Sequence, residues 1–151
     1  MMSETSNSRK RILILCTANS ARSQMAEGIL RWLGGDDYDV HSAGSKATNV
    51  NPYAIEAMDE IGMDIRAQFS KTYERYLGQP WDAVITVCDN AAEACPFLPG
   101  QYTHIHWSFP DPAAVEGDDA KLQAFRDVRD GLIEKFRAFI SNQEVENHAK
   151  A

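Results

Sequence analysis

The sequence predicts a single α/β domain built on an open, parallel, four-stranded sheet with helices on both faces. Short apolar runs alternate along the chain with longer segments of helical periodicity, which is the pattern of right-handed βαβ crossovers. The chain has 151 residues, 44% hydrophobic and 25% charged, as suits one globular domain with a real core. The domain is expected at 10–141, between a disordered N-terminal tail at 1–9 and a frayed C-terminal tail at 142–151.

The first half of the chain contains two expected strands with a helix between them. Residues 11–16 form a continuous apolar run, which is typical of a buried parallel strand. Residues 23–33 place apolar side chains on one helical face and stop at two glycines. A second strand is expected at 39–43, where it enters a turn at Gly44.

The second half contains two more helices and two more strands. Asn51 and Pro52 predict an N-cap and a first helical residue, and the core stripe of that helix is Ala54, Met58 and Ile61. Strands are expected at 81–88 and 102–107. The last helix is amphipathic, with a core face formed by Leu122, Phe125, Val128, Leu132, Phe136 and Phe139.

The segment between the first strand and the first helix reads C-T-A-N-S-A-R-S, from Cys16 to Ser23. A loop that enters a helix N-terminus directs backbone N–H groups at one point, where the helix dipole also favours negative charge. Small residues allow such a loop to close around a tetrahedral anion as a nest. We therefore expect a tetrahedral oxyanion such as phosphate or sulfate to be held by Thr17, Ala18, Asn19, Ser20, Ala21 and Arg22.

Four side chains of this segment have expected chemical roles. Arg22 offers a planar, two-pronged donor that matches two oxygens of the anion. Cys16 lies in the same positive field, which stabilises its thiolate and makes it a nucleophile. Ser23 can donate its hydroxyl hydrogen to that sulfur, and Asn19 can brace the loop by bonding its turns. The alternative is an inert buried cysteine beside a solvated arginine, and the strand-before, helix-after context argues against it.

The loop resembles the phosphate loop of low-molecular-weight protein tyrosine phosphatases, which have a flavodoxin-like fold, and of the arsenate reductases that share it. The similarity extends from about Arg11 to Ile140. It implies that Asp111, in the Asp-Pro pair after the last strand, is the general acid, although a plain Asp-Pro turn is the alternative. The phosphatases usually continue with a tyrosine, whereas Ala113 and Ala114 follow here, which favours a small inorganic substrate.

Cys88 and Cys95 lie after the third expected strand. They could bridge if the segment between them bends, or they could be two separate packing cysteines. Their resemblance to thioredoxin-coupled arsenate reductases implies a relay. In it Cys16 forms an adduct with arsenate, Cys88 forms a disulfide with Cys16, and Cys95 moves the oxidation to a Cys88–Cys95 disulfide. Thioredoxin or glutaredoxin then reduces that pair. Whether the segment at 89–94 unwinds on oxidation is open.

The implied activity is that of a thioredoxin-dependent arsenate reductase with residual phosphatase activity. Two other functions stay open from the sequence. One is a protein tyrosine phosphatase in which Cys88 and Cys95 protect Cys16 by reversible oxidation. The other is an oxyanion-binding module without turnover, against which Asp111 and the three cysteines argue.

Composition excludes several other classes of function. A net charge of −7 argues against binding to nucleic acid or to an anionic membrane surface. No apolar run approaches the roughly 20 residues of a membrane span, and the polar N-terminus lacks the apolar stretch of a signal peptide. Three cysteines without an export signal favour the reducing cytoplasm. His104 and His106 have no third ligand at a suitable spacing, so no metal site is expected.

In some of these reductases a potassium ion lies behind the phosphate loop. Asn19, Glu27 and Ser42 match positions that help to bind it, but Phe69 and Lys71 stand where a threonine and an aspartate are expected. Because a lysine cannot ligate potassium, we do not expect a potassium ion here. We expect no other tightly bound cofactor either. Our hypothesis is that the Lys71 ammonium takes the place of the cation near Glu27.

Overall fold

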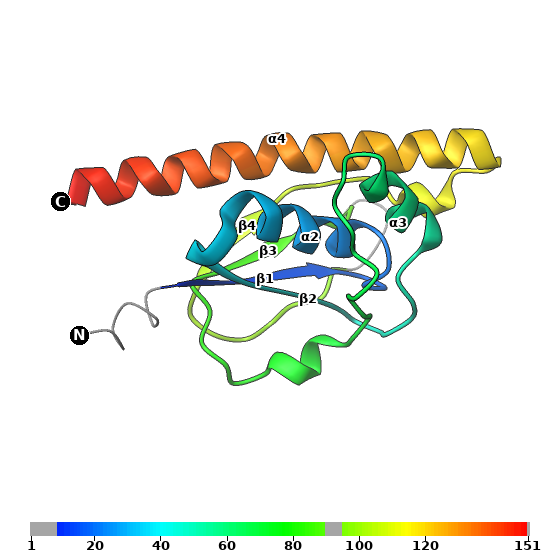
Figure 1. The fold of residues 1–151 in the computed structure, drawn as a ribbon. Helices are drawn as coiled ribbons and strands as arrows, with labels where there is room; N and C mark the ends of the chain where they lie inside the picture. The colour runs from blue at the N-terminus through cyan, green and yellow to red at the C-terminus, as the bar shows by residue number, and fades with distance from the viewer. Residues whose placement is uncertain (1–8, 90–94, 151) are drawn as a thin grey trace.

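The computed structural model describes residues 9–89 and 95–150, with side chains described as far as residue 142. Its four strands are parallel and lie in the spatial order β2-β1-β3-β4 (Figure 1). The predicted α/β fold class is thereby confirmed. The strands are β1 (Lys10–Cys16), β2 (Tyr38–Gly44), β3 (Ala83–Thr86) and β4 (Thr103–His106). Residues 1–8 of the predicted N-terminal tail lie outside the described residues.

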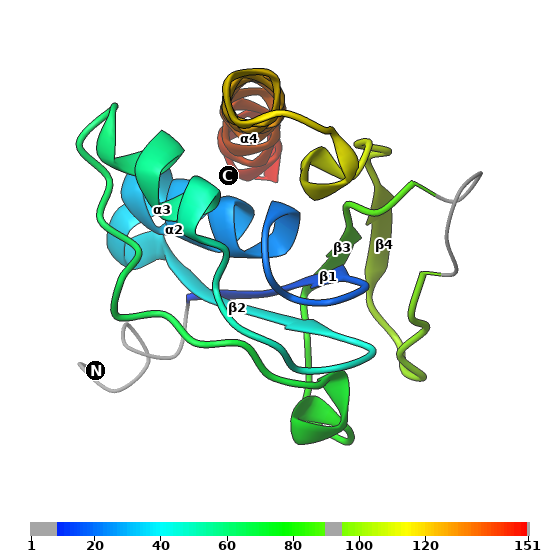
Figure 2. The ribbon, with the colours of Figure 1, turned by 90° about the vertical axis from the view of Figure 1, so that its right-hand side faces the viewer.

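Three α-helices cover one face of the sheet: α2 (Arg22–Gly34), α3 (Pro52–Asp59) and α4 (Asp118–Lys150) (Figures 1 and 2). The second expected helix begins as predicted, because the Asn51 side chain accepts a bond of 2.8 Å from the Tyr53 N–H. Helix α4 continues through the range expected to be a frayed tail, as far as Lys150. The described residues also contain three short 3-10 helices, namely η1 (Gly35–Asp37), η2 (Tyr73–Tyr76) and η3 (Pro112–Ala114).

The opposite face of the sheet is covered differently from the prediction. Helices were expected there, but among the described residues it is the 3-10 helix η2 and the segment around Leu98 that pack on this face. Tyr76 and Trp81 are 5% and 6% exposed and stack edge to face. Large aromatic rings bury much apolar area per residue, so a single short turn covers the sheet where a longer helix was expected.

Strand alternation divides the core into two clusters. Ile12, Ile14 and Cys16 of β1 pack toward the three α-helices, whereas Leu13 and Leu15 pack toward the aromatic side. The predicted core face of α4 is confirmed, because five of its six residues are buried and the sixth is partly buried.

The carboxyl ends of the strands form one edge of the sheet, which faces the viewer in Figure 2. Leu15 is paired with Thr86 of β3, and Thr86 with His106 of β4. The β1–β3 pairing continues past the strand end through a bond of 3.0 Å from the Val87 N–H to the Leu15 carbonyl. Cys16 and Cys88 therefore both leave the sheet at this edge, where ligands bind in open α/β folds.

A carboxylate beyond the end of α3 ties that helix to α4. The Glu60 carboxylate accepts hydrogen bonds from Arg126 at 2.7 Å and from Arg129 at 2.8 Å. Hydrogen bonds from these two guanidinium groups lower the pKa of Glu60 from 4.5 to about 2.

Replacing Glu60 by glutamine is expected to lower the free energy of unfolding at neutral pH and to leave it unchanged near pH 2. The Glu60 carboxyl of the folded protein stays ionised down to its pKa of about 2, whereas that of the unfolded chain protonates near 4.5. The stabilisation is therefore complete above pH 4.5 and is lost as the pH falls from 4.5 to about 2. Urea unfolding of the wild type and of Glu60→Gln across the window measures this, with the exposed Glu134→Gln as control. A pH-independent gap would contradict the assignment.

Candidate functional site

The loop between β1 and α2 lies at the carboxyl edge of the sheet (Figure 2). Strand β1 ends at Cys16, which is 2% exposed, and α2 begins at Arg22, which is 3% exposed. The structure therefore places the predicted nucleophile and the predicted guanidinium at the two ends of one short loop, directly before the N-terminus of a helix.

The carbonyl groups of this loop are all bonded away from its interior. Each carbonyl oxygen from Thr17 to Ser20 accepts at least one hydrogen bond from a group outside the loop. Because the N–H and C=O of a planar trans peptide point in opposite directions, this turns the N–H groups of the loop inward, as in an anion-binding nest. In chain order the donors are the backbone N–H groups of Ser45 and Lys46, the hydroxyls of Thr48 and Ser70, the amide of Gln24 and the backbone N–H of Asn51.

Gly44, at the end of β2, is a glycine because the loop passes very close to it. A Cβ atom at this position would lie 2.6 Å from the Thr17 carbonyl oxygen and 2.8 Å from the Asn19 nitrogen. Both are backbone atoms, so neither can move aside without displacing the loop. The sequence analysis treated Gly44 only as a turn residue, and its contact with the loop was missed.

The side chain of Asn19 connects the loop to three other segments. Asn19 is fully buried and has a φ of 49°, a left-handed conformation that asparagine tolerates better than most residues. Its amide nitrogen donates to the hydroxyls of Ser23, at 2.8 Å, and Ser42, at 3.0 Å. Its amide oxygen accepts from the backbone N–H of Lys71 at 2.9 Å and from Gln24 at 3.0 Å. Asn19 thus braces the loop as predicted. It does so by bonding α2, β2 and Lys71, and not by bonding the turns of the loop itself.

Ser23 is fully buried in the first turn of α2. Its hydroxyl oxygen accepts the bond from Asn19, and a serine hydroxyl that accepts one bond can still donate its own hydrogen elsewhere. The predicted donation from Ser23 to the Cys16 sulfur is compatible with this arrangement and stays a prediction.

Gln24 is a site residue that the sequence analysis missed. It is fully buried, and its amide nitrogen donates to the Asn19 carbonyl at 3.1 Å and to the Phe69 carbonyl at 3.0 Å. Gln68 in turn donates to the Gln24 side chain at 2.8 Å. One feature of the sequence could have indicated this role. Gln24 is a polar residue directly after Arg22 and Ser23, in the first turn of α2, which is buried against the loop.

The segment that carries Asp111 is attached to the loop through Arg22. The Arg22 Nη1 donates to the Phe109 carbonyl at 3.0 Å, two residues before Asp111. Asp111 itself is exposed, and its carboxylate caps η3 by accepting a bond of 3.0 Å from the Ala113 N–H. The structure therefore brings the predicted acid to the loop's edge of the sheet, and its catalytic role stays a prediction.

The two remaining cysteines form a disulfide, and Cys16 is a free thiol. The Cα atoms of Cys88 and Cys95 are 6.0 Å apart. Cys88 is fully buried and Cys95 is partly exposed. Of the two possibilities left open by the spacing, the structure thus has the bridged one. The question of unwinding concerns the segment at 89–94, of which residues 90–94 lie outside the described residues.

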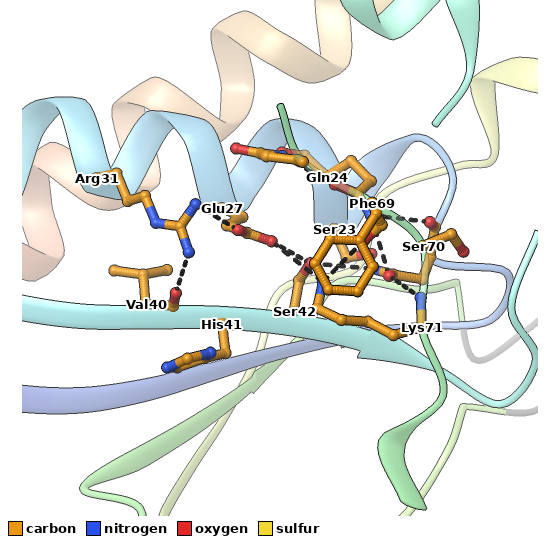
Figure 3. A network of polar contacts seen from close by, with 12 residues as sticks. Ser23, Gln24, Glu27, Arg31, Val40, His41, Ser42, Phe69, Ser70 and Lys71 are labelled. Carbon is orange, nitrogen blue, oxygen red and sulfur yellow. Dashed lines mark hydrogen bonds and ion pairs between the residues drawn. The ribbon is translucent and has the colours of Figure 1, made fainter. Parts of the chain in front are cut away.

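An ion-pair network centred on the buried Glu27 lies behind the loop (Figure 3). The Glu27 carboxylate is bonded to the Ser42 hydroxyl at 2.5 Å and to Arg31 at 2.6 Å. The Lys71 ammonium lies 3.7 Å from Glu27 and donates to the Phe69 carbonyl at 2.9 Å. The ammonium therefore lies among the groups matched to the potassium ligands, where the hypothesis placed it.

The charge of Lys71 is affected by two opposing influences. Burial of the ammonium lowers the pKa of Lys71 from its ordinary value, and the Glu27 carboxylate partly opposes this shift. Glu27 keeps a second cation, Arg31, on its other oxygen. The Lys71 ammonium therefore supplies a positive charge beside Glu27. The Glu27 carboxylate accepts from Ser42, whose hydroxyl in turn accepts the bond from Asn19 in the loop.

No group of three histidine, cysteine or acidic side chains in residues 9–89 and 95–142 could hold a metal ion. Among the described helices, none is long and apolar enough to cross a membrane.

Comparison with known proteins relates both fold and loop to one family. The model of the family described as "Low molecular weight phosphotyrosine protein phosphatase" matches residues 11–151. An arsenate reductase of Halalkalibacterium halodurans is 48% identical over 132 residues, which cover 87% of this chain and 95% of that protein.

Solved structures agree with this relationship. An arsenate reductase in the phosphate-binding state has a TM-score of 0.71 at 32% identity, with 88% of this chain and 98% of that chain covered. A thioredoxin-dependent arsenate reductase of Corynebacterium glutamicum has a TM-score of 0.63 at 25% identity, with 93% of this chain and 67% of that chain covered.

The Gly44→Ala substitution is expected to weaken the binding of inorganic phosphate by about tenfold or more, because the new Cβ would displace the loop backbone at Thr17 and Asn19. Calorimetric titration of the reduced protein with phosphate measures the dissociation constant. Ser45→Ala is the control, since it removes one hydroxyl bond of 3.2 Å to Thr17 but keeps the backbone bond. Equal affinities of Gly44→Ala and wild type would contradict the close approach.

Exchanging sodium for potassium is expected to change the activity and melting temperature of the wild type very little, because the Lys71 ammonium already lies beside Glu27. Lys71→Met should lower the melting temperature, since Glu27 then loses one of its two cationic neighbours in a buried position. Thermal unfolding in matched potassium and sodium buffers tests both statements. A strong rise in wild-type activity with potassium would refute the hypothesis.

Proposed function

Because the chain belongs to the low molecular weight phosphotyrosine protein phosphatase family, and within it to the arsenate reductases, we propose that it reduces arsenate to arsenite through a three-cysteine relay reset by thioredoxin. The observation that carries the proposal is the pairing of Cys88 with Cys95 while Cys16 stays a free thiol. This distribution of oxidation is the one expected after one turnover and before re-reduction.

The first step is the formation of a covalent adduct. The inward N–H groups of the loop and the Arg22 guanidinium hold the oxyanion above the Cys16 thiolate. The thiolate attacks arsenic and displaces one hydroxyl group of hydrogen arsenate, which leaves as water after taking a proton from Asp111. The bond from Arg22 to the Phe109 carbonyl supports this role, because it fixes the segment that carries the acid against the arginine.

The second step moves two electrons to arsenic. The Cys88 thiolate attacks the Cys16 sulfur, a Cys16–Cys88 disulfide forms, and the electrons of the sulfur–arsenic bond leave with arsenic as arsenite. Cys95 then attacks Cys88, which forms the Cys88–Cys95 disulfide and returns Cys16 as a thiolate. The proximity of Cys16 and Cys88 at one sheet edge, through the Val87–Leu15 hydrogen bond, supports this exchange.

The last step is reduction by an external dithiol. Cys88 is fully buried and Cys95 is partly exposed, so the sulfur open to attack is that of Cys95. We assign this step to thioredoxin because the Corynebacterium relative is described as thioredoxin-dependent. A cycle that ends in reduced thiols requires a reducing compartment, which favours the cytoplasm.

Mixing reduced protein with arsenate, in the absence of any reductant, is expected to give one arsenite per chain and a Cys88–Cys95 disulfide. Cys95→Ser should still release one arsenite but stop at a Cys16–Cys88 disulfide, because the attack on Cys16 needs only Cys88. Cys88→Ser should release none. Arsenite is measured by chromatography, and the disulfides by mass spectrometry of unreduced peptides.

Asp111→Asn provides a separate check on the acid. It should slow arsenite release by about 10²–10⁴-fold, the usual contribution of a positioned acid, without changing the disulfide formed. Hydrolysis of an aryl phosphate that survives Cys88→Ser, together with no arsenite from the wild type, would instead assign the protein as a phosphatase. Phosphate binding with neither product would leave an oxyanion-binding module.

A further inference from the structure

A strongly exposed phenylalanine stands beside the Cys88–Cys95 disulfide. Phe97, two residues after Cys95, is 75% exposed. Among the described residues, the other large apolar side chains at the surface are less exposed, at 62% for Trp32, 52% for Phe69 and 48% for Leu77. A single exposed apolar residue needs no explanation, so it is the position of Phe97 next to a redox disulfide that is informative.

Phe97 lines a cavity of about 180 Å³ that Cys95, the more exposed half of the disulfide, also lines. The cavity lies against β3 and β4 on the face of the sheet that is opposite the α-helices. Its surface is mainly apolar, with one imidazole at the edge. The lining residues that matter here are Cys95, Pro96, Phe97, Leu98, Tyr102 and His104.

The segment that presents Phe97 is anchored on both sides of it. Pro96 restricts the backbone directly before Phe97. Leu98, directly after it, is 2% exposed and belongs to the core cluster with Tyr76 and Trp81. The Tyr102 hydroxyl also donates a hydrogen bond to the Leu98 carbonyl. Phe97 therefore points outward from a fixed backbone, so that a partner would pay little entropy to order it.

The chemistry of the disulfide determines what must lie on this surface. Because Cys88 is fully buried, an attacking thiolate has to reach the sulfur of Cys95, which lines the cavity. A small dithiol can do so alone. A protein that carries its dithiol in a folded domain must instead cover the cavity wall around Cys95, including Phe97.

We infer that Phe97 and this cavity form the docking surface for the thioredoxin that reduces the Cys88–Cys95 disulfide. The inference rests on the proposed function for the identity of the partner. In the step concerned, one thioredoxin thiolate attacks Cys95 and releases the Cys88 thiolate, which takes up a proton. The second thioredoxin thiol attacks the mixed disulfide and releases Cys95, so one disulfide is reduced while two thioredoxin thiols become a disulfide.

The test follows reduction of the purified disulfide form, without arsenate, by thioredoxin kept reduced with thioredoxin reductase and NADPH. Phe97→Ala should raise the KM for thioredoxin by about tenfold or more, as expected for removal of a central aromatic contact. Reduction of the same variant by dithiothreitol should match the wild type, because a small dithiol needs no docking surface. Phe97→Tyr should keep most of the affinity. Trp32→Ala is the matched control, because Trp32 is also exposed but lies on α2, which packs on the opposite face of the sheet from the segment around Leu98.

Each other result overturns the inference. An unchanged KM with thioredoxin removes Phe97 from the docking surface. An equal loss with dithiothreitol means that Phe97 acts on the disulfide itself. A defect with glutaredoxin but not with thioredoxin assigns the surface to another partner. Because arsenate is absent, these results are independent of arsenite release, which tests the proposed function separately.

Discussion

The buried amide of Asn19 is the constraint on which the rest of the site depends. It holds a left-handed backbone inside the loop and is bonded to α2, to β2 and to Lys71. A left-handed non-glycine residue costs roughly 1–2 kcal/mol, and each of its hydrogen bonds returns about 1 kcal/mol. The four bonds of the side chain together therefore offset the cost of the left-handed conformation, which helps to keep the peptide N–H groups of the loop turned inward.

The surrounding structure keeps those partners in place. Gly44 allows β2 to approach the loop backbone, and the Lys71–Glu27 pair closes the space behind Ser42 with charges from the chain itself. The whole molecule has a net charge of −7, which is unfavourable for an anionic substrate. Local positive potential at the loop therefore has to come from the helix N-terminus and Arg22, held in fixed positions.

Periodicity and short motifs predicted the parts of the structure that depend on local sequence. The apolar run to Cys16, the Asn51 cap and the apolar face of α4 each act within a few residues. The missed features depend on contacts across the fold. The roles of Gln24 and Gly44 exist only because β2 and residues 69–71 pack against the loop. The prediction of helices on both faces was wrong for the face opposite the α-helices, because aromatic rings near η2 cover the sheet there.

The loop is expected to hold its N–H groups inward before an anion arrives, because groups outside the loop already bond its carbonyls. The most direct measurement is an amide NMR titration of the reduced protein with phosphate. We predict large shifts for the inward N–H groups of Ala18–Arg22, and unchanged signals for the backbone N–H groups of Ser45 and Asn51, which bond carbonyls of the loop from outside. Equal shifts in both groups, or loop signals that emerge only with phosphate, would contradict a pre-formed site.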